Sequence, residues 1–175
     1  MRRIIISIFW LFIISDVLLN KDLNKATFSL GFNPQALINK QAHFQIGCII
    51  DYKHEIVLPI IPNYKNDDLT YSNYGIEYRY HRSKDIRGKL IGLGLNVSRV
   101  DWAYENETEM ITKTILYPYI IYGYRIIIGE NFGFVTKMIG DYKIGDLKAK
   151  DGTERLDRPY SNYKLSFGFE LEYFF

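Results

Sequence analysis

The chain ends in the stretch YKLSFGFELEYFF, residues 163–175, in which apolar side chains occupy alternate positions. One face carries Tyr163, Leu165, Phe167, Phe169, Leu171, Tyr173 and Phe175. The other face carries Lys164, Ser166, Gly168, Glu170, Glu172 and Phe174. Successive side chains of a β-strand point to opposite sides, so a period of two residues indicates a strand between two different environments. The stretch therefore predicts a long strand with one entirely apolar face.

The same alternation recurs along the chain from Ala26 onward. It predicts strands over residues 28–32, 44–52, 54–61, 73–81, 91–97, 110–126, 132–142 and 163–175. Pro59 and Pro118 fall inside two of these segments and weaken the third and sixth strands, because proline removes a hydrogen bond from a strand ladder. The pattern as a whole predicts an all-β chain of eight strands.

The composition limits the class of protein. A length of 175 residues fits one domain, and 47% apolar with 24% charged residues is a globular composition. The formal net charge of +2 is too balanced for a nucleic-acid-binding surface. A single cysteine, Cys48, excludes an internal disulfide and a thiolate metal cluster. What needs explaining is the aromatic content of 16%, with 15 Tyr and 11 Phe.

The connections between the predicted strands alternate in length. Tight turns are expected at residues 53–54, 83–87 and 129–131, and longer polar loops at residues 34–40, 62–70, 105–109 and 145–159. The longer loops follow the first, third, fifth and seventh strands, so they all lie at one end of an up-and-down arrangement. This layout is typical of an antiparallel transmembrane β-barrel with short turns at one rim and longer loops at the other.

The N-terminus predicts export. Arg2 and Arg3 precede the apolar run of residues 4–14, which is the layout of a secretory signal peptide. We expect a signal peptide over residues 1–22, with cleavage possible after Ser15, and a barrel domain over residues 23–175. An uncleaved anchor and a buried helix are the alternatives for this segment.

The faces opposite the apolar ones carry charge. They hold Glu77, Arg79, His81, Lys137, Asp141, Lys164, Glu170 and Glu172, interspersed with glycine. Such faces fit a polar lumen filled by side chains, and the apolar faces then contact lipid. We expect Glu77, Arg79, Lys164, Glu170 and Glu172 to form ion pairs inside the lumen. Tyrosines near strand ends suit the two membrane interfaces, because the ring and the hydroxyl prefer different surroundings.

On these residues the chain resembles the small outer-membrane β-barrel proteins of the OmpA, OmpX and opacity type. The resemblance rests on the last strand and on Pro118-Tyr119-Ile120-Ile121-Tyr122-Gly123-Tyr124-Arg125. It implies a bacterial outer-membrane location and an eight-stranded fold. It also implies that Phe169, Leu171, Tyr173 and Phe175 form a C-terminal signal for the barrel-assembly machinery. Outer-membrane lipid is the other expected partner; an extracellular partner remains unknown, and we expect a monomer.

Chemical motifs are sparse. His81, Ser83 and Glu77 could share one side, as acyl transfer would require, which makes a lipid A acyl hydrolase the first alternative function. However, the tight turn at residues 83–87 places His81 at the periplasmic rim. His43 and His54 lack partners at metal-ligand spacing. The leading prediction is a non-enzymatic barrel without cofactor or metal, and a soluble exported ligand-binding barrel is the second alternative.

Overall fold

A computed structural model describes residues 26–38, 41–50, 53–66, 69–83, 86–103, 110–145 and 162–175. Its elements are β1 (Ala26–Phe32), α2 (Pro34–Ile38), β2 (Phe44–Ile50), β3 (His54–Asn66), β4 (Leu69–His81), β5 (Gly88–Ala103), β6 (Met110–Ile128), β7 (Phe132–Tyr142) and β8 (Tyr163–Phe174). The predicted signal segment, residues 1–22, lies outside the described residues. No helix in the described ranges is long and apolar enough to cross a membrane.

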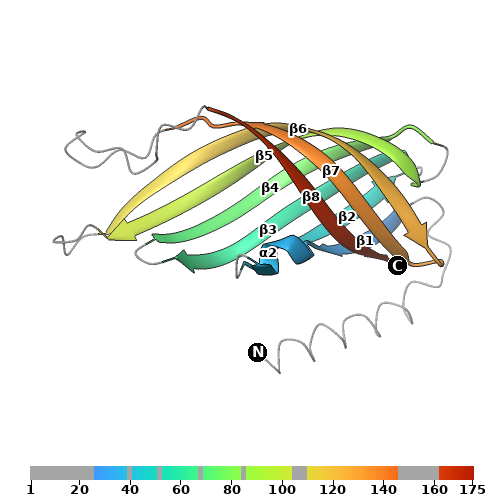
Figure 1. Ribbon diagram of the computed structural model, residues 1–175, viewed down its shortest axis with the longest axis horizontal. Coiled ribbons are helices and arrows are strands. Elements are labelled where there is room, and N and C mark those ends of the chain that lie inside the picture. The colour runs from blue at the N-terminus through green and yellow to red at the C-terminus, as the bar shows by residue number, and fades with distance from the viewer. Residues whose placement is uncertain are drawn as a thin grey trace, which may run out of the picture.

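The strands form one closed antiparallel barrel (Figure 1). Each strand pairs with the next in sequence, and β8 pairs back with β1. The predicted all-β, eight-stranded, up-and-down fold is confirmed. Closure matters physically because it leaves no sheet edge running the length of the wall.

Two predicted connections differ from the structure. The loop expected over residues 62–70 is wrong, because β3 continues to Asn66 and β4 begins at Leu69. The pairing of β3 with β4 continues through this region after a register shift between Ile61 and Tyr64. A β-bulge therefore accommodates Pro62 without ending the strand. The loop expected over residues 34–40 contains the short helix α2.

Both doubtful prolines lie where the ladder is interrupted. Pro59 pairs with Gln45 of β2, but the register of β3 with β4 has no pair for it. Pro118 pairs with Leu95 of β5, whereas the β6–β7 ladder stops at Tyr119 and resumes as a bridge between Leu116 and Ile144. Leu116 exchanges both backbone hydrogen bonds with Ile144, so the amide that Pro118 lacks, two residues further on, would face β7, and its absence accounts for this gap in the ladder.

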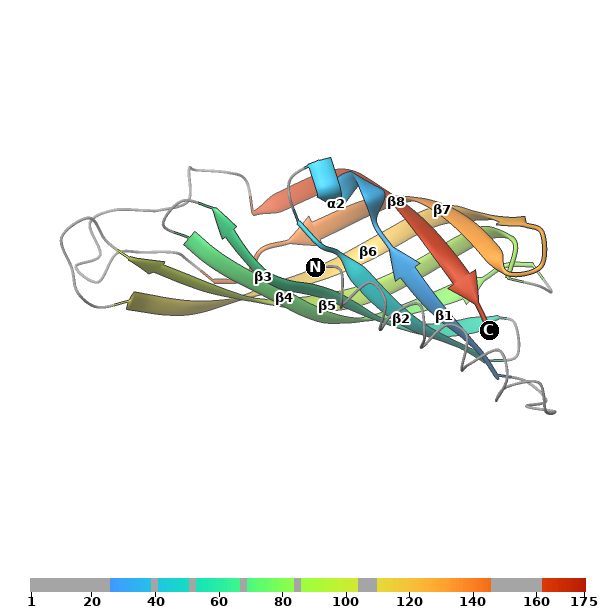
Figure 2. The ribbon, with the colours of Figure 1, turned by 90° about the horizontal axis from the view of Figure 1, so that it is seen from below.

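The wall of the barrel is uneven in height. β8 pairs with β7 along Tyr163–Tyr173, but it pairs with β1 only through Leu171–Phe174. The amide of Phe175 adds one more bond, to the carbonyl of Phe28 at 3.0 Å. We call this short β1–β8 junction the seam. Opposite it, the β5–β6 hairpin reaches furthest from the end that carries the C-terminus (Figures 1 and 2).

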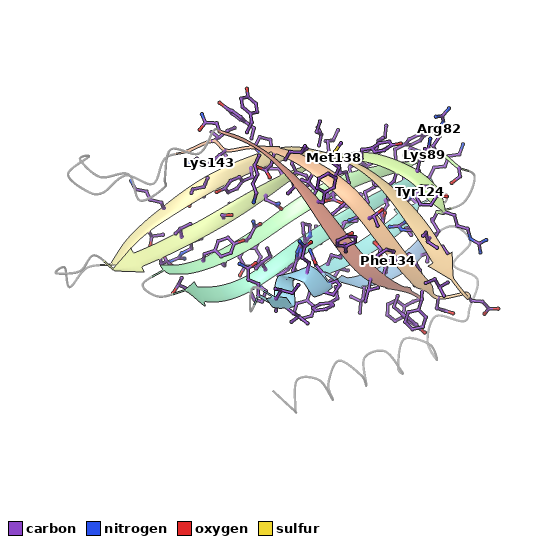
Figure 3. The ribbon with its side chains drawn as sticks, viewed as in Figure 1. Arg82, Lys89, Tyr124, Phe134, Met138 and Lys143 are labelled. Atoms are coloured by element: carbon purple, nitrogen blue, oxygen red, sulfur yellow. The ribbon has the colours of Figure 1, made fainter. Side chains whose placement is uncertain are left out.

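The outer surface of the barrel is apolar and the inner surface is charged. Exposed large side chains include Leu93, Ile120, Tyr122, Tyr163, Leu165 and Phe167. Figure 3 shows the labelled Tyr124, Phe134 and Met138 on the wall between the two rims. In contrast, seven of the largest fully buried side chains are polar or charged: Arg79, Arg125, His81, Glu55, Glu77, Glu170 and Glu172. This polarity is the reverse of that of a water-soluble barrel.

Candidate functional site: a charged cluster in the lumen

Glycines on the inner face make room for large side chains. A Cβ atom at Gly94 would lie 2.3 Å from the ring of Tyr119, and one at Gly31 would lie 2.4 Å from the side chain of Gln45. Neither contact is sterically possible, so both positions require the absence of a side chain. Eight strands enclose a lumen that is just wide enough to be filled by side chains. The glycines leave space for the long polar side chains to reach across it.

Arg79 of β4 lies at the centre of the cluster and is fully buried. Its guanidinium lies 2.8 Å from Glu170 Oε2, 2.9 Å from Glu172 Oε1 and 3.8 Å from Glu55 Oε2. It also forms an ion pair with Glu77 on its own strand. Arg79 therefore joins carboxylates from three strands, β3, β4 and β8.

Arg125 of β6 forms a second centre nearer the C-terminal end. Its Nη2 atom donates to Glu55 Oε2 at 2.8 Å, and its Nε atom lies 2.7 Å from Glu172 Oε2. The guanidinium lies over the ring of Phe174, 5.4 Å from the ring centroid, which is cation–π distance. His81 Nε2 is 3.0 Å from Glu55 Oε2. Glu55 and Glu172 thus link Arg125 with Arg79.

Three further side chains complete the network. Lys137 Nζ of β7 lies 2.5 Å from Glu170 Oε1 and 3.3 Å from Glu77 Oε2. The hydroxyl of Tyr119 donates to Glu77 Oε2 at 2.8 Å. Gln45 of β2 donates to Glu170 at 3.1 Å and to Glu172 at 3.0 Å. We use the name lumen cluster for Gln45, Glu55, Glu77, Arg79, His81, Tyr119, Arg125, Lys137, Glu170 and Glu172.

The lumen cluster closes the barrel interior. Four carboxylates face two guanidiniums and one ammonium, with His81 beside them. Buried charges of this kind persist only when they are paired and hydrogen-bonded, and removing one partner is costly. His43 lies between α2 and β2. Burial lowers the pKa of its imidazole below the usual value of 6.5, so this side chain adds no permanent charge.

The predicted lumen residues separate into two groups. Glu77, Arg79, Glu170 and Glu172 lie together in the lumen cluster. Lys164 does not join them: it is exposed near the start of β8, opposite Asp141 of β7. Alternation places Lys164 on the same side as Glu170, but six residues at about 3.3 Å each separate the two along the strand.

Sequence reasoning missed Glu55 and Arg125 as members of the cluster. Glu55 lies in β3, where Pro59 weakened the prediction, yet Glu55, Val57 and Pro59 alternate as its inward residues. Arg125 is the last residue of the segment 118–125. Tyr122 and Tyr124 of this segment point outward, so alternation places Arg125 on the inward side. Alternation within these strands was the signal that could have placed both side chains inside.

The predicted assembly residues lie along the outer face of β8. Phe169 and Leu171 are exposed, and Phe169 stacks on Phe134 of β7 with ring centroids 6.0 Å apart. Tyr173 and Phe175 are half-buried and meet edge to face, with centroids 5.1 Å apart. Their role as an assembly signal stays a prediction.

The described residues do not assemble the acyl-transfer site considered above. His81 contacts Glu55 and Arg125 inside the lumen cluster. The hydroxyl of Ser83 instead donates to the carbonyl of Arg87 within its own turn. In the same ranges, no group of three or more His, Cys, Asp or Glu side chains could hold a metal ion.

Comparison with known proteins identifies the fold. The chain resembles the crystal structure of the N-terminal β-barrel domain of Pseudomonas aeruginosa OprF, with a TM-score of 0.53 and 13% sequence identity. The similarity covers 87% of this chain and 98% of that domain. No protein-family model and no curated protein sequence matches the chain. The comparison thus supports the closed β-barrel fold of this chain.

We predict that Tyr119→Phe lowers the free energy of unfolding by about 1.5–3 kcal/mol, the range for a hydrogen bond to a charged group. The variant keeps the ring against Gly94 but leaves Glu77 without its hydroxyl donor. Denaturant titration of the barrel folded into lipid vesicles measures the change. Tyr122→Phe is the matched control, because Tyr122 faces outward. Equal stability of both variants would contradict the assigned bond.

Proposed function

We propose that the chain is a non-enzymatic integral protein of a bacterial outer membrane. The observation that carries this proposal is the reversed polarity of the barrel. Its wall exposes isoleucine, leucine, phenylalanine and tyrosine, and its interior buries an ion-pair network. Monomeric soluble proteins rarely expose apolar patches larger than a few hundred Å². A lipid bilayer is the solvent in which this distribution is favourable.

The apolar side chains inside the barrel do not form a core that would support a soluble protein. The buried clusters there are small: Leu90, Tyr119, Ile121 and Val135 in one, and Val100 with Ile115 in the other. A soluble ligand-binding barrel would reverse the two faces, with an apolar cavity inside. The lumen cluster occupies that space, so we do not favour the ligand-binding alternative.

The closed lumen favours a structural role over transport. Arg79 and its carboxylate partners are fully buried, so the interior provides no open path at their level. The barrel would then act through its outer wall, by stabilising the membrane, and through its loops, by surface contacts. We expect the protein to work as a monomer that the barrel-assembly machinery inserts after export.

Orientation follows from the lengths of the connections. The start of β1, the C-terminus and the tight turn at Gly129, whose φ of 67° suits glycine, lie at the same end. In outer-membrane barrels the short turns face the periplasm and the longer loops face outward. We therefore place residues 104–109 and 146–161 outside the cell and both termini in the periplasm.

A tag inserted at Gly152, which lies outside the described residues, tests location and orientation together. We expect an impermeant reagent to label the tag on intact cells. A tag at Glu130, in the opposite turn, is the control and should be labelled only after lysis. Labelling of Glu130 alone on intact cells would reverse the orientation. A soluble periplasmic fraction containing the protein would overturn the membrane location.

A further inference from the structure

One row of the outer wall lacks a side chain. Leu93, Ile120, Gly140 and Leu165 lie side by side across β5, β6, β7 and β8. A Cβ atom at Gly140 would have a single neighbour within 4 Å, Ile120 Cγ1 at 3.6 Å. The barrel's own packing therefore does not require a glycine here, unlike at Gly94. The consequence of Gly140 is a hollow on the outer surface.

The hollow is large enough to hold a ligand. It forms a groove of about 720 Å³, within the 300–1,000 Å³ typical of ligand sites. Its walls are mainly Leu93, Pro118, Ile120, Tyr142, Tyr163 and Leu165. Ile120 is 70% exposed and Leu165 is 65% exposed, and these two side chains flank Gly140. An apolar groove of this kind fits a hydrocarbon chain.

One end of the groove is polar. The rings of Tyr142 and Tyr163 meet there with centroids 4.8 Å apart, at the level of the gap that Pro118 makes in the β6–β7 ladder. Lys164 lines the groove and is exposed, and Lys143 follows Tyr142 (Figure 3). Asp141 also lines the groove, so the lining holds one carboxylate and one ammonium group. This end carries the exposed ammonium of Lys164 and two hydroxyls.

We propose that the groove binds one acyl chain of lipid A, with a glucosamine phosphate beside Lys164. The inference rests on the proposed orientation, which places the Tyr142 and Tyr163 end toward the outer leaflet. Lipid A supplies both required chemistries, since it combines saturated acyl chains with phosphate groups. Tyrosine hydroxyls at the boundary of the apolar region suit the level of the headgroups.

Native mass spectrometry of the folded barrel in mild detergent, with added bis-phosphorylated lipid A, tests the proposal. We expect one lipid A adduct on the unmodified protein and a loss of at least about tenfold in its abundance for Gly140→Leu, which fills the hollow. Thr136→Leu adds the same side chain on the outward face of β7 away from the groove and should retain the adduct. Lys164→Ala should weaken the preference for bis-phosphorylated over dephosphorylated lipid A.

Four outcomes would overturn this assignment. They are the absence of an adduct, equal loss in both leucine variants, an equally abundant adduct with phosphatidylethanolamine, and a dimer that Gly140→Leu abolishes. The last result would make the groove a contact between two copies of the chain. Heat-modifiable gel migration of the same samples shows whether the barrel is folded. It therefore distinguishes failure of the barrel proposal from failure of the lipid A site. A barrel that inserts into outer membranes but retains no lipid A refutes only the lipid site.

Discussion

Replacing Arg79 with leucine is expected to lower the free energy of unfolding by about 3–5 kcal/mol, the usual cost of breaking a buried ion pair. The side chain contacts carboxylates of Glu55, Glu77, Glu170 and Glu172. Leucine would leave these charges with Arg125 and Lys137 as their permanent cations. Denaturant titration in vesicles and the temperature at which gel migration changes both measure the loss.

Two further variants make the result specific to the lumen cluster. Arg99→Leu removes an arginine whose side chain is 62% exposed and pairs with Asp101, so it should cost less than about 1 kcal/mol. Adding Glu170→Leu to Arg79→Leu should recover part of the loss, because it removes a carboxylate together with its cation. An Arg79→Leu barrel as stable as the Arg99→Leu barrel would show that the cluster is not energetically coupled.

Replacing Phe175 with aspartate is expected to abolish assembly of the barrel in cells. The main chain is unchanged, so the bond from the amide of residue 175 to the carbonyl of Phe28 can still form. Acidic residues near a membrane interface cost roughly 0–1 kcal/mol in such barrels, too little to unfold one. A complete loss must then come from recognition of the C-terminal face. Immunoblots of membrane and periplasmic fractions measure assembly.

Refolding separates recognition from stability. The purified Phe175→Asp chain should fold into lipid vesicles nearly as well as the unchanged chain. Phe174→Leu is the matched control, because Phe174 points into the lumen against Arg125. That variant should assemble in cells with reduced stability. Normal membrane levels of Phe175→Asp would count strongly against the assembly signal and against the outer-membrane proposal.

The alternation of side chains predicted the strands and their two faces. In residues 163–175 it placed Glu170 and Glu172 on the face opposite Phe169 and Leu171, as the structure has them. This works because the period of a strand is local and needs no knowledge of its neighbours. β3 continues past Pro59 and β6 continues past Pro118. At each proline the pairing is interrupted on one side of the strand only.

The members of the lumen cluster could not be chosen from alternation alone. Glu55 and Arg125 are 70 residues apart, and they meet because the registers of the intervening strands bring them to one level. Alternation fixes which face a side chain occupies but not its height along the barrel. The same limit explains Lys164, which shares the alternation of Glu170 but lies toward the opposite end of β8, where its side chain is exposed. Register depends on every pairing around the wall.

The short seam has a consequence for the order of folding. Its partners, such as Ser29 and Phe174, are separated by almost the whole chain, whereas β2 to β8 can form by successive hairpins. Closing a long loop costs entropy, and here few rungs compensate for it. The β1–β8 pairing should therefore form last, and its rupture should be the first step of unfolding. A kinetic intermediate with the β1–β8 pairing open and the successive pairings from β1 to β8 still formed is the species that such a barrel would populate.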